Sequence, residues 1–396
     1  MAAVGLGHTW SFASLVFGLG VVSGTDPQTT RAYGAGDPAE AGRVALHGLG
    51  LAGLVSVGVL TAHLLAGPAL TGLSQPASVI GDATRYCWIL AAGVWPFLGF
   101  ALLRQLLQAG GSMRPATWVV LAANLVNLVA DLVLVHGFDQ GVAGLAWATV
   151  VVRWFMLIGL IAVGWPILRK ARPAGWFDGW EGRAVLRLVP IALPVGFQLG
   201  FEVWAFNAAT LLAGTLGETA VAAHSTALSA ISLAFMVPLG LGAAATTRVG
   251  NAVGAGSPWK PAGSTAIVLG AGCMALSGAL FLGAPELVAG AYTREAAVIG
   301  LAASILPVAA AFGVFDGTQV VAMGVLRGLG DTRFAAGIAL FAYWIVGLPV
   351  SLFALQRWGL VGVWIGLSVG LGTSAVLCVL RVVWLGTRDD APVLDR

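Results

Sequence analysis

The sequence has few charged residues, few cysteines and no nucleotide-binding motif. Charged residues make up 9% of the 396 residues, whereas a soluble globular domain carries roughly 25%. This shortage excludes a soluble enzyme, a nucleic-acid-binding protein and a disordered scaffold. The three cysteines lie far apart in apolar runs and predict neither a disulfide framework nor a metal site. A phosphate-binding loop of the form G-x-x-x-x-G-K-[ST] is missing, so ATP-driven transport has no support. We expect no enzymatic activity and no cofactor.

The sequence is instead rich in apolar residues, which make up 58% of the chain. A membrane-spanning helix needs about 20 of them. The runs are too long and too continuous for barrel strands, which have about 10 residues with alternating polarity. Interruptions by glycine, proline and charged residues therefore predict an all-α polytopic membrane protein with eleven spans. These spans lie at about 2–24, 41–67, 78–107, 115–136, 141–166, 188–213, 219–245, 261–285, 296–325, 334–355 and 359–385.

The basic residues predict the orientation. If the segment from Arg31 to Arg43 is cytoplasmic and the spans alternate, 16 of the 20 Lys and Arg residues lie on the cytoplasmic side. The exceptions are Arg85, Arg294 and Arg357 on the opposite side and Arg153 within a span. Such a bias follows the positive-inside rule. We therefore expect a multi-pass protein of the cell (inner) membrane with its C-terminus in the cytoplasm, which places Met1 outside.

The two halves of the chain resemble each other at an offset of about 220 residues. Three sets of residues match in order, and each set follows a span of the same rank. A parallel repeat of this kind, related by an axis along the membrane normal, is found in some secondary transporters. The matches pair Gly34–Pro38 with Gly254–Pro258, Gly111 and Arg114 with Gly330 and Arg333, and Gly141 and Gly144 with Gly359 and Gly362.

The repeat indicates that the first half has one helix fewer than the second. The span 188–213 precedes the repeated region, and its counterpart would lie before residue 1. We therefore expect two pseudo-symmetric helical bundles with five and six spans. The bundles would comprise residues 1–167 and 188–396, joined by a cytoplasmic basic linker at 168–187. A start upstream of Met1 is the simplest account, and a natural eleven-span protein is the alternative.

Several segments resemble the multidrug and toxic compound extrusion (MATE) family, and most of all its NorM-like bacterial branch. The resemblance covers essentially the whole chain, and the motifs of the second half are the more specific. It implies two six-helix bundles that export cationic amphipathic compounds in exchange for Na+ or H+, although the first helix of that pattern is absent here. The segments are Phe315–Val321, Leu326–Arg333, Ala222–His224, Val237–Gly240, Val253–Gly256, Ala32–Asp37 and Asn124–Asn127 with Asp131.

Two carboxylates lie within predicted spans of the second half. A charge at the centre of a bilayer costs about 2.5–3.5 kcal/mol on insertion scales, so a charged residue retained there is a candidate for function. Glu202 lies near the middle of the span 188–213, and Asp316 lies well inside the span 296–325. The resemblance places the family's essential carboxylates at these positions. We expect the two residues to face one interior site and to couple Na+ or H+ to transport. Structural hydrogen bonding is the alternative.

A second candidate cation site lies in the first half. Asn124, Asn127 and Asp131 share one face of the span 115–136, because residues four and seven apart project on the same side of a helix. Oxygen-bearing side chains of this kind suit a hard cation or a proton. Interhelical hydrogen bonding is the alternative. In the family this face works with an aspartate of the first helix, which this sequence lacks.

Aromatic residues near the two carboxylates are candidates for the substrate cavity, because aromatic rings attract lipophilic cations. The residues are Trp204, Phe312, Phe315 and Trp344. Arg153, the internal cation, is either a counter-ion or a structural partner. We expect a monomer that binds small cationic amphipathic substrates and no nucleic acid. Two other functions stay open: a lipid-linked oligosaccharide flippase of the wider superfamily, which a basic cavity would favour, and an inactive truncated remnant.

Overall fold

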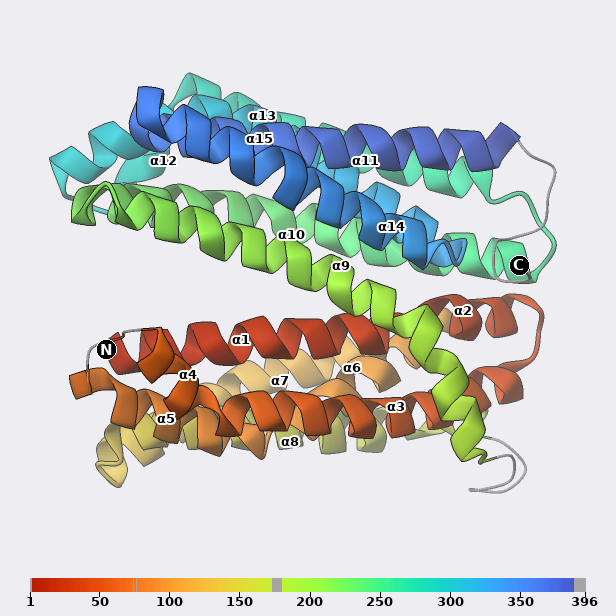
Figure 1. The fold of residues 1–396 in the computed structure, drawn as a ribbon. Coiled ribbons are helices and arrows are strands. Elements are labelled where there is room, and N and C mark those ends of the chain that lie inside the picture. Colours follow the sequence, from red (N-terminus) through yellow and green to blue (C-terminus); the bar gives the residue numbers. More distant parts are fainter. Residues whose placement is uncertain (1, 74, 76, 173–179, 388–396) are drawn as a thin grey trace. The chain divides into compact units, whose positions relative to one another are not determined.

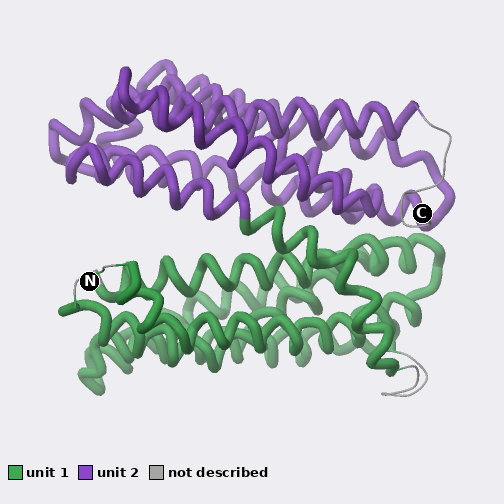
Figure 2. Tube along the Cα trace, in the orientation of Figure 1, with its two compact units in different colours: residues 1–200 green, residues 201–396 purple. Residues whose placement is uncertain are grey.

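The computed structural model describes residues 2–73, 75, 77–172 and 180–387, and the chain separates into two compact units, 1–200 and 201–396 (Figure 2). Each unit is a bundle of long helices (Figure 1). The described part contains helices and no strands, which confirms the predicted all-α class. Within the predicted linker, residues 173–179 lie outside the described part, as do Met1, Arg388 and Arg396. The predicted boundary at 188 stays a prediction.

The first unit is built from eight α-helices, one short π-helix and the first part of α9. The predicted first span ends at residue 24, and in the structure a second short helix follows it after a turn and continues to Gly34. Pro27 fits in the first turn of this second helix, because a backbone N–H there would have no acceptor within the helix. The elements are α1 (Ala2–Ser23), α2 (Asp26–Gly34), α3 (Pro38–Leu64), α4 (Ala66–Gly72), α5 (Ala77–Ala91), α6 (Val94–Ala109), α7 (Arg114–Asp131), η1 (Leu132–Gly137), α8 (Gly141–Leu168) and α9 (Gly182–Gly214).

The second unit contains the rest of α9 and the remaining helices. Its longest element, α15, is two helices joined at Gly359, whose φ of 55° and ψ of −131° are not helical. The elements are α10 (Glu218–Gly254), α11 (Lys260–Gly283), α12 (Pro285–Gly290), α13 (Ala296–Gly328), α14 (Thr332–Ala339), η2 (Leu340–Gly347) and α15 (Leu348–Thr387).

The helices match the predicted spans. Nine described helices are long and apolar enough to cross a membrane, and the pair α5 and α6, bent by 47°, adds a tenth. The 56-residue stretch Thr332–Thr387 is counted once among the nine, yet it would be about 84 Å long as one helix, far more than a bilayer of about 30 Å. Its break at Gly359 divides it into the two predicted spans 334–355 and 359–385. Every one of the eleven predicted spans therefore corresponds to a helix.

Three matched pairs of glycines show that the repeat extends to backbone conformation. Gly36 and Gly256, Gly111 and Gly330, and Gly141 and Gly359 all have φ between 53° and 77°. At the first two pairs the glycine ends a helix in a Schellman motif. In it, the amide of the next residue donates to the carbonyl five positions back, for example Asp37 to Ala32 at 2.9 Å and Ser257 to Ala252 at 2.8 Å. Only glycine adopts this conformation without strain.

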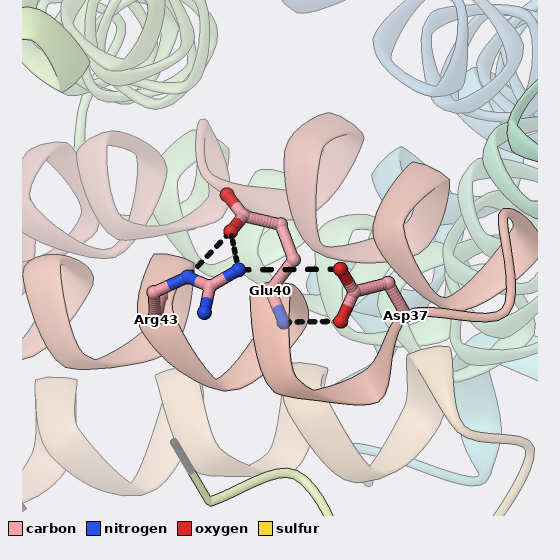
Figure 3. A network of polar contacts seen from close by, with 3 residues as sticks. All are labelled: Asp37, Glu40 and Arg43. Atoms are coloured by element: carbon pink, nitrogen blue, oxygen red, sulfur yellow. Dashed lines mark hydrogen bonds and ion pairs between the residues drawn. The ribbon is translucent and has the colours of Figure 1, made fainter. Parts of the chain in front are cut away.

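An aspartate and two charged neighbours stabilise the start of α3 (Figure 3). The Asp37 carboxylate accepts a hydrogen bond from the Glu40 amide at 2.9 Å, which caps the helix. Arg43 donates to the Glu40 carboxylate at 2.6 Å and lies 4.0 Å from Asp37. These side chains are largely exposed, so the ion pairs add little stability. The ion pairs do, however, give both acidic groups at the start of α3 a basic partner, Arg43.

Candidate functional site

Glu202 lies at the start of the second unit, in the middle of α9. The indole nitrogen of Trp344 donates to the Phe201 carbonyl at 3.1 Å, which ties this turn of α9 to η2. One turn further on, the Phe206 ring packs edge-on against Phe312 of α13, with centroids 5.9 Å apart. These contacts fix α9 beside η2 and α13 and so hold Glu202 within the bundle.

Asp316 lies on α13, the central helix of the second unit, and its side chain is only 4% exposed. The neighbouring residue, Gly317, explains how α13 can pack so closely against α11 that Asp316 is buried. A Cβ atom at Gly317 would lie 2.6 Å from the Gly270 carbonyl oxygen of α11 and from the Met274 side chain. The absence of a side chain therefore lets α11 and α13 pack closely at the level of the carboxylate.

Glu202 and Asp316 lie close enough for their charges to interact. Gln319 lies one turn beyond Asp316 on α13. Its side chain is fully buried, and its amide nitrogen donates to the Glu202 carboxylate and contacts the Met323 sulfur at 3.2 Å. Arg327, at the end of α13, is the basic residue whose charge acts on Glu202. Two ionised carboxylates this close repel each other unless a cation or a proton joins them.

Further buried oxygen atoms lie at the same place. Asp316 Oδ1 and Gln319 Oε1 are buried and have no hydrogen-bond partner within the part of the chain that the structure describes. The hydroxyls of Tyr343 and Ser374 are also buried and adjacent, and Tyr343 lies within electrostatic reach of both carboxylates. A buried oxygen without a partner is costly, because it has given up its hydrogen bonds to water. Carboxylate, amide and hydroxyl oxygens are the ligands of hard cations.

The space beside this cluster is small. A void of about 10 Å³ lies next to Tyr343, between α9, η2 and α15. That volume is at the lower limit for one water molecule. The void therefore has room for one water molecule at most, and neither Glu202 nor Asp316 lines it. The residues around it are Ala205, Ala209, Tyr343, Gly347, Leu348, Ser351, Leu367 and Gly370.

The aromatic candidates occupy different places in the second unit. Phe312 is buried between the rings of Phe206 and Trp364. Trp204 contacts Phe201 edge-on, and Trp344 is partly buried. Phe315 is 37% exposed and lies over Gly372 of α15. Phe312 thus belongs to the packed interior, while Trp204, Trp344 and Phe315 keep accessible surface.

The first-half candidates lie on α7, where the structure leaves much of the helix surface uncovered. Asn124 is exposed and donates to the Val120 carbonyl of its own helix at 3.0 Å. Asn127 and Asp131 are partly exposed. Within the described residues, the side-chain amide of Asn124 therefore bonds to the backbone of its own helix.

Arg153 of α8 lies where α5 bends into α6. Its side chain contacts the Gly93 position and lies over the Phe97 ring, with its central carbon 5.3 Å from the ring centroid. One guanidinium nitrogen is buried and has no hydrogen-bond acceptor among the residues that the structure describes. Its aromatic neighbour provides a cation–π contact, which supports a packing role at the bend.

Sequence reasoning missed Gln319, Tyr343 and Ser374. Gln319 could have been found, since it lies three residues after Asp316 and so on the same face of one helix. Among the described residues no three His, Cys, Asp or Glu side chains are arranged to hold a metal ion. The cluster combines two carboxylates with neutral oxygens, an arrangement suited to reversible binding of one monovalent cation or proton.

Comparison with known proteins identifies relatives along the whole chain. The family model described as MatE matches residues 1–133 and 194–353, which include both carboxylates and the α7 candidates. A probable multidrug resistance protein NorM from Bradyrhizobium diazoefficiens is 37% identical over 98% of this chain and 86% of its own length. The multidrug resistance protein PmpM from Pseudomonas aeruginosa is 33% identical over 96% of this chain and 83% of its own.

Solved structures share the fold. The crystal structure of the eukaryotic MATE transporter AtDTX14 superimposes with a TM-score of 0.88 at 24% identity, over 96% of this chain and 87% of that one. A MATE protein crystallised in a bent conformation gives 0.87 at 22% identity, over 98% and 88%. At this identity the likeness concerns the arrangement of helices alone.

Proposed function

Because the chain belongs to the MatE family, we propose that it is a secondary active multidrug exporter that moves cationic amphipathic compounds outward in exchange for Na+ or H+. The observation that carries the proposal is that Glu202 and the buried Asp316 lie within electrostatic reach of each other inside one unit, with Gln319 bonded to Glu202. The names of the relatives, which are multidrug resistance proteins, support drugs as the substrates. The chain is a multi-pass membrane protein, and we place it as a monomer in the cell (inner) membrane with a cytoplasmic C-terminus.

The mechanism uses one site for two competing cations. A proton or Na+ that enters from outside cancels one of the two negative charges of Glu202 and Asp316 and so weakens their attraction for a cationic drug. The drug then leaves, the protein changes the side to which its site is open, and the small cation is released inside. A ligand shifts a conformational equilibrium only by its difference in affinity between the two states. The carboxylates supply that difference, because their net charge depends on whether the cation is bound.

The acidic character of this site favours drug export over the flippase alternative. A lipid-linked oligosaccharide carries negative phosphates and would require a basic cavity. The side chains of Gln319, Tyr343 and Ser374 add neutral oxygen atoms around Glu202 and Asp316. The charge of Arg327 also acts on Glu202, so two carboxylates stand against one positive charge. A cation is the ligand that this arrangement stabilises.

Transport in proteoliposomes tests the proposal. We expect ethidium to move across the membrane when a Na+ or proton gradient is imposed in the opposite direction, and to stop when an ionophore collapses that gradient. Imposing the two gradients separately identifies the coupling ion. Liposomes without protein correct for leakage. Ethidium movement that continues unchanged after collapse of both gradients would exclude coupled antiport, and transfer of lipid-linked oligosaccharide without ethidium movement would favour the flippase.

A further inference from the structure

A groove in the first unit lies at the ends of α3, α6 and α8 that the basic residues assign to the cytoplasm. It encloses about 190 Å³. Ten of its twelve lining residues are uncharged and mostly apolar, and the other two are Arg169 and Arg172, directly after α8. The lining residues are Gly42, Ala45, Leu46, Leu49, Leu103, Leu106, Ile161, Trp165, Leu168, Arg169, Ala171 and Arg172.

The internal repeat explains why this groove is open. In the second unit the corresponding seam lies between α11 and α15. The Trp259 ring lies 3.5 Å from a Cβ built at Gly263 and 3.8 Å from one built at Gly386, and the Lys260 side chain lies 3.7 Å from the latter. Trp259 therefore covers that seam. At an offset of 220 its counterpart is Ala39, whose methyl group is too short to cover the same place.

The charged side chains that line the groove, among the residues that the structure describes, are both basic. They are Arg169 and Arg172, which lie at its cytoplasmic end. The nearest acidic residue along α3, Glu40, is paired with Arg43. Trp165, which is 39% exposed, lies one turn before Arg169. An apolar slot ending in a tryptophan and two arginines at the headgroup level has the polarity profile of a phospholipid.

We propose that this groove binds one anionic glycerophospholipid, with an acyl chain along α3, α6 and α8 and the phosphate at Arg169 and Arg172. Basic pockets between spanning helices on the cytoplasmic side are suited to anionic headgroups. The lipid would cover the seam in the first unit that Trp259 covers in the second. This proposal concerns the wall of the first unit and is independent of which compound is transported.

Native mass spectrometry of the purified full chain tests the proposal, with phosphatidylglycerol and phosphatidylcholine of identical acyl chains as probes. We expect the wild-type protein to retain one phosphatidylglycerol in preference to phosphatidylcholine. Replacing both arginines, as R169Q/R172Q, should lower that preference roughly tenfold or more, because each basic residue near an anionic headgroup contributes about 1 kcal/mol. The matched control K170Q/R183Q removes two positive charges from exposed neighbours that do not line the groove, and should keep the preference.

A second variant tests the groove itself. Ala39→Trp copies the tryptophan of the second unit and leaves both arginines in place, so it should remove the bound lipid without changing the thermal stability of the protein. Three outcomes would overturn the proposal. The wild type retains no phosphatidylglycerol, R169Q/R172Q and K170Q/R183Q lose the preference equally, or the folded Ala39→Trp variant still binds the lipid. The last result would place the headgroup on the arginines with no chain in the groove.

Discussion

Glu202→Gln and Asp316→Asn are each expected to reduce ethidium efflux from cells to the level of an empty vector. Each amide has nearly the shape of the carboxyl group that it replaces but lacks its charge, so cation binding no longer changes the charge of the site. The proteins should be inserted and folded as well as the wild type, because a charge within the membrane is itself costly. Efflux rates at equal expression, with thermal stability measured in parallel, provide the check.

Glu218→Gln is the matched control for this loss. It makes the same chemical change at an exposed residue in the first turn of α10, in the same unit. We expect it to transport at the wild-type rate. If Glu202→Gln and Asp316→Asn also transported at that rate, the two carboxylates would not carry the coupling.

Gly324→Ala is expected to destabilise the second unit. A Cβ atom at this position of α13 would meet the backbone of Gly242 on α10, lying 2.9 Å from its carbonyl carbon, 3.0 Å from its Cα and closest to its carbonyl oxygen. Backbone atoms move only if the two helices separate, and overpacking of this kind costs roughly 1–3 kcal/mol or more. A separation would also break the hydrogen bond from the Thr246 hydroxyl to the Gly324 carbonyl, which is 2.9 Å long.

The control for that substitution lies on the same helix. A Cβ at Gly300 would have no neighbour within 4 Å, so Gly300→Ala should be neutral or slightly stabilising, since alanine favours a helix by about 1 kcal/mol over glycine. Thermal unfolding in detergent compares the two variants. Equal unfolding temperatures would show that α10 and α13 are farther apart at Gly242 and Gly324 than in this structure. The claim that close packing requires glycine at position 324 would then be wrong.

The sequence was sufficient to place the helices and the two carboxylates, because both depend on local signals. Apolar runs broken by glycine and charge predict spans, and the cost of a charge in a bilayer marks Glu202 and Asp316 within them. The matched glycines Gly36 and Gly256 also share a positive φ, which the sequence match alone did not state. The first predicted span, 2–24, ends within one residue of α1, and the short helix α2 that follows it was not predicted.

The neutral members of the site depend on packing between distant helices. Tyr343 lies in an apolar run, within a π-helix that changes the rotation per residue. A sequence pattern read with the α-helical period therefore predicts the wrong helix face for Tyr343. Ser374 lies on the last helix, and only the folded bundle brings it to Tyr343. The open groove in the first unit is a similar case. The difference between Ala39 and Trp259 is visible in the repeat, but the width of the gap between α3 and α8 is set by the whole unit.

Competition between drug and cation on the purified protein tests the central claim most directly. Binding of tetraphenylphosphonium should weaken when Na+ is added or the pH is lowered, and the change should fall within the roughly 5- to 150-fold range that is usual for coupled sites. In Glu202→Gln and Asp316→Asn the same additions should leave the affinity nearly unchanged. Wild-type affinity that is equal with and without Na+ and at high and low pH would contradict the account, because Glu202 and Asp316 would then not be shared by drug and coupling ion.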